Sequence, residues 1–144
     1  MRLSPEAYRK VLEQVPILCV DGVIINQKGQ FLLVRRRHEP YRGEWWIPGG
    51  RVLKGERLEE AFKRKMREEL SIEVKILAPI GYYEERHESE EWGVPGGVHA
   101  VSVVFCALPL SLDVRLDDQS SEWGFFGDLP AGLKGLGRFH AWLP

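Results

Sequence analysis

The order of hydrophobic and polar positions along the chain predicts alternating helices and strands. Ser4 followed by Pro5 is typical of a helix start, and the pattern indicates a helix that ends near Gln14. Apolar runs bounded by turn residues predict strands at residues 17–25, 30–37, 72–87, 98–108 and 123–126. A helix over residues 129–142 is expected near the end of the chain. Strands and helices in this order favour an α/β fold, in which a mixed sheet is sandwiched between helices.

Turn residues predict how these strands connect. Residues 26–29 form a turn, so we expect the strands on either side of it to pair with each other. The strand at residues 72–87 should bend at Pro79 or Gly81. A polar loop should follow it at residues 88–97.

The helix expected between the second and third strands has an unusual polar pattern. At about 100° per residue, its apolar side chains fall on one stripe that should bury against a sheet. The stripe consists of Leu58, Ala61, Phe62, Met66 and Leu70. Glu69 falls inside this stripe, within about 20° of Leu58. A buried carboxylate is costly unless a cation or hydrogen bonds satisfy it. We therefore interpret this helix as part of a metal- and phosphate-binding site rather than as a solvated charged helix.

The composition agrees with a compact enzyme and argues against several other classes. The 144 residues carry 20 basic and 21 acidic side chains, and this balance gives no reason to expect nucleic acid or a membrane surface as a partner. We expect residues 1–144 to form a single domain. No apolar run reaches the roughly 18 residues of a membrane span. The N-terminus lacks an apolar signal core, so a cytoplasmic location is expected. Cys19 and Cys106 lie in apolar runs and should be reduced core residues.

The segment at residues 49–72 carries the most specific motif of the chain, GGRVLKGERLEEAFKRKMREELSI. It resembles the signature of the Nudix hydrolase family, in which a Gly and a Glu six residues later precede an Arg-Glu-aliphatic-x-Glu-Glu core. The matching residues are Gly50, Glu56, Arg64, Met66, Glu68, Glu69 and Ile72. Lys65 stands where the family has the first Glu of the core. Ser71 replaces a Gly that mainly serves the end of the helix.

Residues 30–52, QFLLVRRRHEPYRGEWWIPGGRV, resemble one branch of this family, the GDP-mannose mannosyl hydrolases. The short helix before a strand that contains Asp21 is similar to that branch as well. Because the branch also lacks the first Glu of the core, the departure at Lys65 agrees with it. The resemblance implies a Mg²⁺ cofactor, with Mn²⁺ as a substitute, and a small-molecule nucleotide substrate. It also suggests a homodimer, because the mannosyl branch forms one.

Glu69 is the first candidate metal ligand, because Mg²⁺ prefers oxygen ligands and is commonly held by one or two carboxylates together with substrate phosphates. The resemblance adds the backbone carbonyl of Gly49. It also adds Gln119, which lies in the loop where the mannosyl branch has a metal-binding Gln, although Gln119 alone would read as an ordinary loop residue. Glu68 offers a second carboxylate, and its alternative is an ion pair with Arg64, four residues earlier.

Lys65 lies four residues before Glu69, so the two side chains share a face of the helix. We interpret the Lys65 ammonium as occupying part of the space in which other family members bind further metal. That would leave a one-metal site with a built-in positive charge. The alternative is that Lys65 extends its ammonium to solvent.

Arg36 and Arg51 are the candidate phosphate-binding residues, because a guanidinium fits phosphate oxygens in a bidentate manner. Both match residues that stabilise the departing diphosphate in the mannosyl branch. Asp21 matches another active-site residue of that branch. A buried Asp in a strand needs a partner such as Arg51, so a purely structural ion pair is the alternative for Asp21.

The residue that activates water is the least defined part of this site. The mannosyl branch has a His directly after the metal-binding Gln, but this chain has Ser120 there, and an unassisted Ser is a poor base. His87 matches a second His of that branch, and an ordinary imidazole exchanges protons near neutral pH. Glu122 is a further candidate, because many relatives that attack phosphorus have a carboxylate there. His99 is as well explained as a core histidine.

Three functions remain open. The first is a nucleotide-sugar hydrolase that attacks the sugar carbon, for example one that converts GDP-mannose to GDP and sugar. The second is a pyrophosphohydrolase, which places water on phosphorus and usually needs several carboxylates and metals; Glu68 and Glu122 favour it. The third is a non-catalytic nucleotide-binding module, for which Lys65 and Ser120 would be signs of lost turnover.

Overall fold

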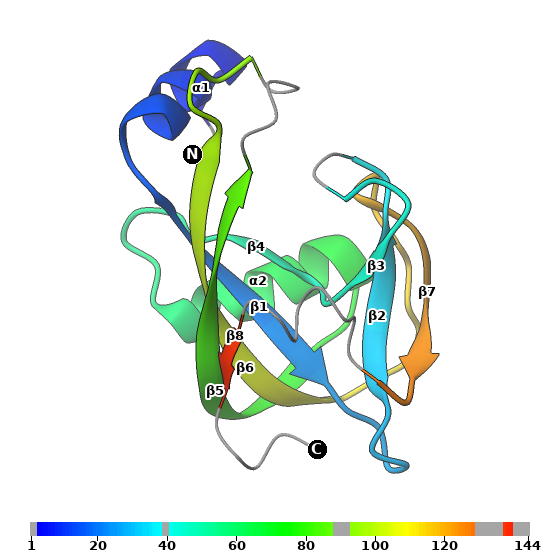
Figure 1. The fold of residues 1–144 in the computed structure, drawn as a ribbon. Helices are drawn as coiled ribbons and strands as arrows, with labels where there is room; N and C mark the ends of the chain where they lie inside the picture. Colours follow the sequence, from blue (N-terminus) through cyan, green and yellow to red (C-terminus); the bar gives the residue numbers. More distant parts are fainter. Residues whose placement is uncertain (1–2, 39–40, 88–92, 129–136, 140–144) are drawn as a thin grey trace.

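The computed structural model describes residues 3–38, 41–87, 93–128 and 137–139 (Figure 1). Its elements are α1 (Pro5–Gln14), β1 (Ile17–Ile24), β2 (Phe31–Arg36), β3 (Trp45–Trp46), β4 (Gly49–Arg51), α2 (Leu58–Leu70), β5 (Val74–His87), β6 (Val98–Pro109), β7 (Ser120–Phe126) and β8 (Gly137–Phe139). None of the helices in these ranges has the length and apolar character of a membrane span.

The strands form two sheets. The larger sheet has five strands in the order β4-β1-β6-β5-β8, and the smaller one has the order β3-β2-β7. Within the larger sheet β1 and β6 run parallel, and the other neighbours are antiparallel. The mixed sheet and the α/β class expected from the sequence are therefore confirmed. In Figure 1, α2 lies against the larger sheet, and β2, β3 and β7 stand beside it as a separate layer.

The expected pairing of the first two strands is wrong. β1 pairs with β4 and β6, whereas β2 pairs with β3 and β7. Around the turn, only an isolated bridge joins Ile25 to Phe31 in the described part of the chain. Both strands are buried over most of their length, and each has a neighbouring strand on both sides. Two largely buried strands thus become interior strands of different sheets instead of forming one hairpin.

α1 begins where the sequence predicts. The Ser4 side chain accepts a hydrogen bond from the Ala7 amide at 3.2 Å, and Pro5 lies in the first turn. The helix packs through Leu12 onto Val94 and Val98, near the start of β6. In Figure 1 it lies at one end of the larger sheet, next to the end of β1 from which the chain enters the fold.

α2 buries the stripe predicted for it. Ala61, Phe62, Met66 and Leu70 have no exposed surface and form a core cluster with residues of β1 and β6. The helix approaches β1 closely at Gly22, where an added Cβ would lie 2.1 Å from Cζ of Phe62. This close approach requires a residue without a side chain at that position.

The end of α2 explains why Ser71 can replace the family's Gly. Ser71 adopts a left-handed conformation, with φ of 57°, and its amide donates to the Arg67 carbonyl at 3.0 Å. Its hydroxyl donates to the Arg115 carbonyl at 3.2 Å. This additional hydrogen bond offsets part of the conformational cost that a non-glycine residue has there.

The later elements agree with the sequence in part. β5 shows register shifts between Ile76 and Ala78 and between Pro79 and Gly81, which confirms the predicted bend. β7 contains the strand expected at residues 123–126, but β8 follows it.

The helix expected over residues 129–142 is wrong at residues 137–139, because these residues pair with the edge of β5 as a strand. The rest of that prediction, residues 129–136 and 140–142, lies outside the described residues. So does the first part of the expected loop, residues 88–92.

Candidate active site

A cleft with a volume of about 610 Å³ opens over one face of the larger sheet. Its walls come from α1, the ends of β2 and β4, α2 and the loop before β7. This volume lies within the usual range of roughly 300–1,000 Å³ for sites that bind small molecules. The cleft also contains part of the sequence motif, since Gly49, Gly50, Lys65 and Glu69 line it.

The floor of the cleft follows from the strand register. Cys19 of β1 lies opposite Ser102 of β6, which in turn lies opposite Tyr83 of β5. Alternate residues of a strand point to the same face, so Asp21 and Glu85 belong to this floor, and all five residues line the cleft. β6 is the central strand of this floor, and its Ser102 side chain is small, which leaves room for a ligand above it.

The two cysteines are free thiols, as expected, but they differ in place. Cys106 is buried in the core, whereas Cys19 is only partly buried and faces the cleft. Burial raises the pKa of Cys19 to about 12, and the nearby carboxylate of Asp21 adds to this shift. The Cys19 thiol therefore stays protonated and is a weak nucleophile.

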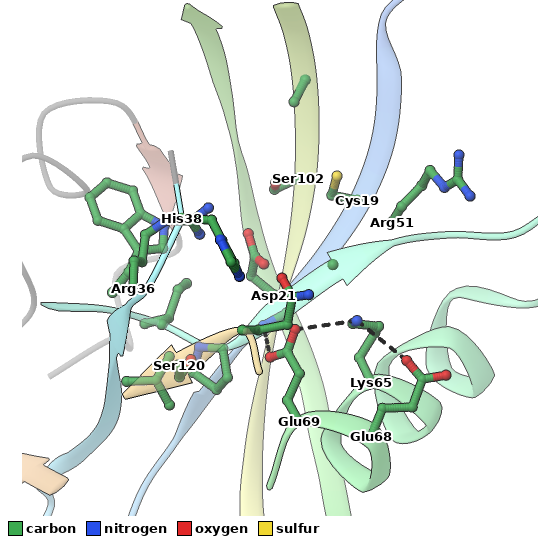
Figure 2. A pocket seen from close by; sticks show the side chains of 18 of the residues that line it. Cys19, Asp21, Arg36, His38, Arg51, Lys65, Glu68, Glu69, Ser102 and Ser120 are labelled. Atoms are coloured by element: carbon green, nitrogen blue, oxygen red, sulfur yellow. Dashed lines mark hydrogen bonds and ion pairs between the residues drawn. The ribbon is translucent and has the colours of Figure 1, made fainter. Parts of the chain in front are cut away.

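Glu69 is a buried carboxylate at the edge of the floor, with 6% of its surface exposed. Its Oε2 accepts a hydrogen bond from the Gly49 amide at 3.3 Å, and its Oε1 lies 3.3 Å from Lys65 Nζ (Figure 2). Burial raises the pKa of Glu69 to about 7, and Lys65 opposes this shift. The negative charges of Asp117 and Asp21 raise the pKa further. A cation would relieve this crowding of carboxylates.

Lys65 lies against Gly50 of β4, with only 14% of its side chain exposed. Its Nζ is 3.3 Å from Glu68 Oε2 as well as 3.3 Å from Glu69 Oε1. A Cβ added to Gly50 would lie 2.4 Å from Lys65 Cε. The alternative in which Lys65 extends to solvent is therefore wrong, and its ammonium is a fixed positive charge between two carboxylates.

Arg64 ties α2 to the turn that precedes it. It donates two hydrogen bonds to Glu56, at 2.7 and 2.9 Å, and one to the Arg51 carbonyl at 2.9 Å. It also pairs with Glu68 at 3.1 Å, which confirms the alternative partner expected for that carboxylate. Burial raises the pKa of Glu68, but the hydrogen bond from Arg64 and the charge of Lys65 outweigh it and hold this pKa below its usual value. Glu68 is thus an ionised group that already has two cationic neighbours.

Asp21 has 7% of its surface exposed and lies at the centre of a hydrogen-bond chain. The Tyr83 hydroxyl donates to Asp21 Oδ2, and the Trp46 indole donates to the Tyr83 hydroxyl at 3.2 Å. Burial raises the pKa of Asp21 to about 7, while the hydrogen bonds from Tyr83 and Ser102 oppose the shift. Asp21 therefore exchanges its proton near neutral pH.

The expected pairing of Asp21 with Arg51 is wrong. The register of β1 and β4 places Arg51 opposite Cys19, whereas Asp21 lies opposite Gly49. The Arg51 guanidinium instead lies 4.4 Å from the centroid of the Tyr8 ring on α1. Arg51 still lines the cleft, so its candidate role in binding phosphate remains compatible with its position.

Arg36 and Arg51 lie on opposite sides of the buried carboxylates (Figure 2). Arg36 ends β2 and faces the cleft, where its charge opposes the rise in the pKa of Asp21. The two guanidinium groups therefore approach the space above Asp21 and Glu69 from different strands. A ligand with two phosphate groups could contact both.

The two candidates for activating water, His87 and Glu122, and the Ser120 that replaces the branch's His differ in position. His87 Nε2 lies 2.5 Å from Glu85 Oε2, and the described residues that line the cleft include Glu85 but not His87. Glu122 lies 3.3 Å from Arg35 in the smaller sheet and is likewise outside the cleft lining. Ser120 lines the cleft and is 4% exposed.

Gln119 also lines the cleft, in an exposed turn. Its amide donates a hydrogen bond to the Asp117 carboxylate at 2.9 Å, and its carbonyl accepts one from the Arg37 amide at 3.1 Å. Both hydrogen bonds use the backbone of Gln119 and not its side chain.

Four further residues of the cleft were missed by sequence reasoning: Tyr8, His38, Glu85 and Asp117. His38 Nε2 lies 3.0 Å from the Asp118 carbonyl, and it carries no recognisable local pattern. Glu85 could have been found, because it alternates with Tyr83 and His87 along a predicted strand. The position of Tyr8 depends on how α1 packs, which no short-range pattern reveals.

The residues present fit a hard divalent cation in part. Glu69, the Gly49 carbonyl and Gln119 offer oxygen atoms, which Mg²⁺ prefers, and Asp117 adds a negative charge. Within the described ranges, no three His, Cys, Asp or Glu side chains converge into a complete metal site. Mg²⁺ usually keeps several waters and takes further ligands from substrate phosphates. Such a partial protein shell is therefore compatible with a metal that binds together with its substrate.

Comparison with known proteins identifies the family of the chain. The family model described as NUDIX domain matches residues 16–132. The chain is 32% identical to the low-salt glycan biosynthesis protein Agl8 of Haloferax volcanii, over 84% of this chain and 72% of that protein. It is also 32% identical to an ADP-ribose pyrophosphatase of Methanocaldococcus jannaschii, over 77% of this chain and 62% of that protein.

Solved structures are similar as well. A MutT protein from Methanosarcina mazei Go1 superposes with a TM-score of 0.65 and 28% identity, covering 78% of both chains. A MutT NUDIX hydrolase from Burkholderia pseudomallei gives a TM-score of 0.64 at 28% identity, covering 81% of this chain and 88% of that one. The overall fold is thus shared with known structures.

Proposed function

The chain belongs to the NUDIX domain family and is a Nudix hydrolase, and we propose that it hydrolyses nucleotide sugars such as GDP-mannose with the help of Mg²⁺. The products of this reaction would be a nucleoside diphosphate and a free sugar. Two relatives support a substrate in which a nucleoside diphosphate is joined to a sugar. One is named for glycan biosynthesis and the other for ADP-ribose.

The observation that carries the proposal is the position of Lys65. Attack of water on phosphorus usually relies on several carboxylates and metal ions. Here an ammonium stands at one of the carboxylate positions, 3.3 Å from both Glu68 and Glu69, and Glu68 is paired with Arg64 as well. This leaves Glu69 as the main carboxylate for a metal, which supports chemistry that demands less activation of water, namely attack at the sugar carbon.

A Mg²⁺ ion would be held by Glu69, the Gly49 carbonyl and Gln119. When bound, the ion would stabilise the negative charge on the departing diphosphate. Mn²⁺ offers similar ligand preferences and would serve as a substitute.

Arg36 and Arg51 would bind the diphosphate from two sides. Their guanidinium groups suit phosphate oxygens, and fixed positive charge favours the transition state in which the diphosphate leaves. Asp21 lies between them with a pKa of about 7. In its protonated form Asp21 can donate a hydrogen bond to a phosphate or sugar oxygen, so that it does not repel the anionic substrate.

A second candidate function is cleavage of the diphosphate itself. The relative named as an ADP-ribose pyrophosphatase favours it, and Glu68 is a carboxylate close to the proposed metal site. The products would then be a nucleoside monophosphate and a sugar phosphate.

The two functions are distinguished by their products. Purified protein is incubated with GDP-mannose and related nucleotide sugars, with Mg²⁺, in water enriched in ¹⁸O, and the products are resolved by phosphorus NMR and mass spectrometry. Nucleoside diphosphate together with ¹⁸O-labelled sugar supports attack at carbon. Nucleoside monophosphate with ¹⁸O in a phosphate refutes it in favour of the second function. A thermal shift on ligand addition without any product supports the non-catalytic alternative. The Glu69→Gln variant is the control for turnover that depends on the metal site.

A further inference from the structure

Attack of water at a sugar carbon needs a base, and the sequence leaves this position unfilled. Ser120 has no acidic or basic group, His87 is outside the cleft lining of the described residues, and Glu122 pairs with Arg35. The cleft floor nevertheless contains a carboxylate to which no part of the mechanism above assigns a role. That carboxylate is Glu85 of β5.

We propose that Glu85 is the general base that takes the proton of the attacking water and that His87 is the residue that positions it. The inference rests on the proposed attack at carbon. It concerns a pair of residues on one strand face, of which the member nearer the cleft is the carboxylate and not the histidine.

The geometry of the pair supports these roles. Glu85 is partly buried, with 12% of its side chain exposed, and it lines the cleft. One carboxylate oxygen, Oε2, lies 2.5 Å from His87 Nε2, so the second oxygen is available to accept from water. Because the two residues are two positions apart on a strand, they share a face, and the pair needs no rearrangement to form.

His87 is itself held in place by aromatic side chains. Its ring and that of Tyr41 make a T-shaped contact, with centroids 5.0 Å apart, and Tyr41 stacks on Trp46 at 4.9 Å. Trp46 is buried between the two sheets. The orientation of the Glu85 carboxylate is thus fixed through a packed chain of residues, as a pre-organised base requires.

The base also lies on the side of the cleft that the reaction requires. Glu69 accepts a hydrogen bond from Gly49 of β4, the strand next to β1, whereas Glu85 is on β5, and β6 separates β1 from β5 in the sheet. The proposed metal ligand and Glu85 therefore lie on opposite sides of the cleft floor. Displacement with inversion needs the water and its base on one side of the carbon and the leaving group on the other. A diphosphate near Glu69 and a base at Glu85 meet this condition.

The water oxygen forms a bond to the anomeric carbon, while the bond between that carbon and the diphosphate oxygen breaks and its electron pair leaves with the diphosphate. The proton lost by the water passes to the free oxygen of the Glu85 carboxylate and is later released to solvent. His87 keeps its hydrogen bond to the other oxygen throughout.

Glu85→Gln tests the base directly, and Glu84→Gln is its matched control, because Glu84 is the neighbouring residue on the opposite, exposed face of β5. We expect Glu85→Gln to lower kcat by about 100-fold or more with little change in KM, as loss of a general base does. Glu84→Gln should keep the wild-type kcat. Thermal denaturation and binding of GDP check that both variants are folded.

Azide provides a second readout, since this anion attacks carbon without a base. With Glu85→Ala, added azide should restore turnover and yield the glycosyl azide, whereas wild-type protein should gain nothing. His87→Asn should lower kcat by about tenfold, and azide should raise its rate as well. These variants keep the test decisive if Glu85→Gln does not fold.

The outcomes separate this inference from the proposed function. Suppose that the wild-type protein releases nucleoside diphosphate and sugar. Glu85 is then not the base if Glu85→Gln keeps kcat within threefold or changes only KM. The same conclusion follows if azide fails to restore the turnover of Glu85→Ala. If the wild-type protein releases nucleoside monophosphate instead, the proposed function fails and the inference fails with it.

Discussion

Replacing Glu69 by Gln should make the metal-free protein more stable at alkaline pH, although the same change should abolish its activity. Glu69 has an ordinary pKa of 4.5 and a pKa of about 7 in the folded protein, chiefly because it is buried. A raised carboxyl pKa means that the folded state holds the proton more tightly than the unfolded state does. Stability is therefore lost as the pH rises from about 4.5 towards 7, and the loss is complete above that range.

The size of the effect follows from the shift. A difference of about 2.5 pKa units corresponds to about 3 kcal/mol at pH 8, and to less than about 1 kcal/mol at pH 5. Gln has nearly the same shape as a protonated Glu, and its side-chain oxygen can still accept from the Gly49 amide. For a chain of this length, about 3 kcal/mol corresponds to an increase of roughly 10 °C in Tm.

The assay is thermal or urea denaturation of both proteins in EDTA at pH 8 and pH 5. Glu68→Gln is the matched control with the opposite sign. The pKa of Glu68 is lowered in the folded protein, so its charge stabilises the fold above its ordinary pKa and this contribution is lost as the pH falls. Glu68→Gln should therefore destabilise the protein at pH 8. The prediction is refuted if Glu69→Gln melts at or below the wild-type temperature at pH 8, or if it shifts Tm equally at both pH values. Burial would then not raise the pKa of Glu69 as described.

Three other predictions address separate parts of the molecule. Lys65→Glu should increase the number of Mn²⁺ ions bound per chain, as counted by the EPR signal of free Mn²⁺, and unchanged stoichiometry together with unchanged activity would refute the one-metal interpretation. Gly22→Ala should destabilise the fold by about 1–3 kcal/mol in urea denaturation, because its Cβ would lie 2.1 Å from the buried Phe62 ring; Gly127→Ala, whose Cβ meets nothing within 4 Å, is the control. Arg51→Ala should lower kcat/KM by about 100-fold, as loss of a charge-stabilising group does, and steady-state kinetics that stay within threefold of wild type would exclude Arg51 from diphosphate binding.

The elements whose form depends on local periodicity could be predicted from the sequence. The apolar stripe of α2 and the burial of Glu69 within it follow from 3.6 residues per turn, and the contact of Lys65 with Glu69 follows from their spacing. The start of α1 follows from Ser4 and Pro5. In each case the interacting groups lie within one turn of a helix, so the sequence distance fixes the distance in space.

The parts that depend on long-range pairing could not be predicted. Nothing near residues 26–29 indicates that β1 prefers β6, which lies some 80 residues later, to the strand that follows it. The register of β1 and β4 then decides that Arg51 faces Tyr8 and not Asp21. For the same reason the resemblance pointed to His87, whereas only the assembled sheet reveals that Glu85 is the member of the pair that reaches the cleft.

α1 lies before the residues that match the family model, yet Pro5 and Tyr8 line the cleft. The helix packs on the rest of the protein through the small cluster around Leu12 and through the contact of Tyr8 with Arg51. The rim of the cleft and its floor are thus built from separable parts of the chain. An exchange of the helix would therefore alter the rim of the cleft, together with the Tyr8 ring on which Arg51 packs, and would leave the floor residues of β1, β5 and β6 in place.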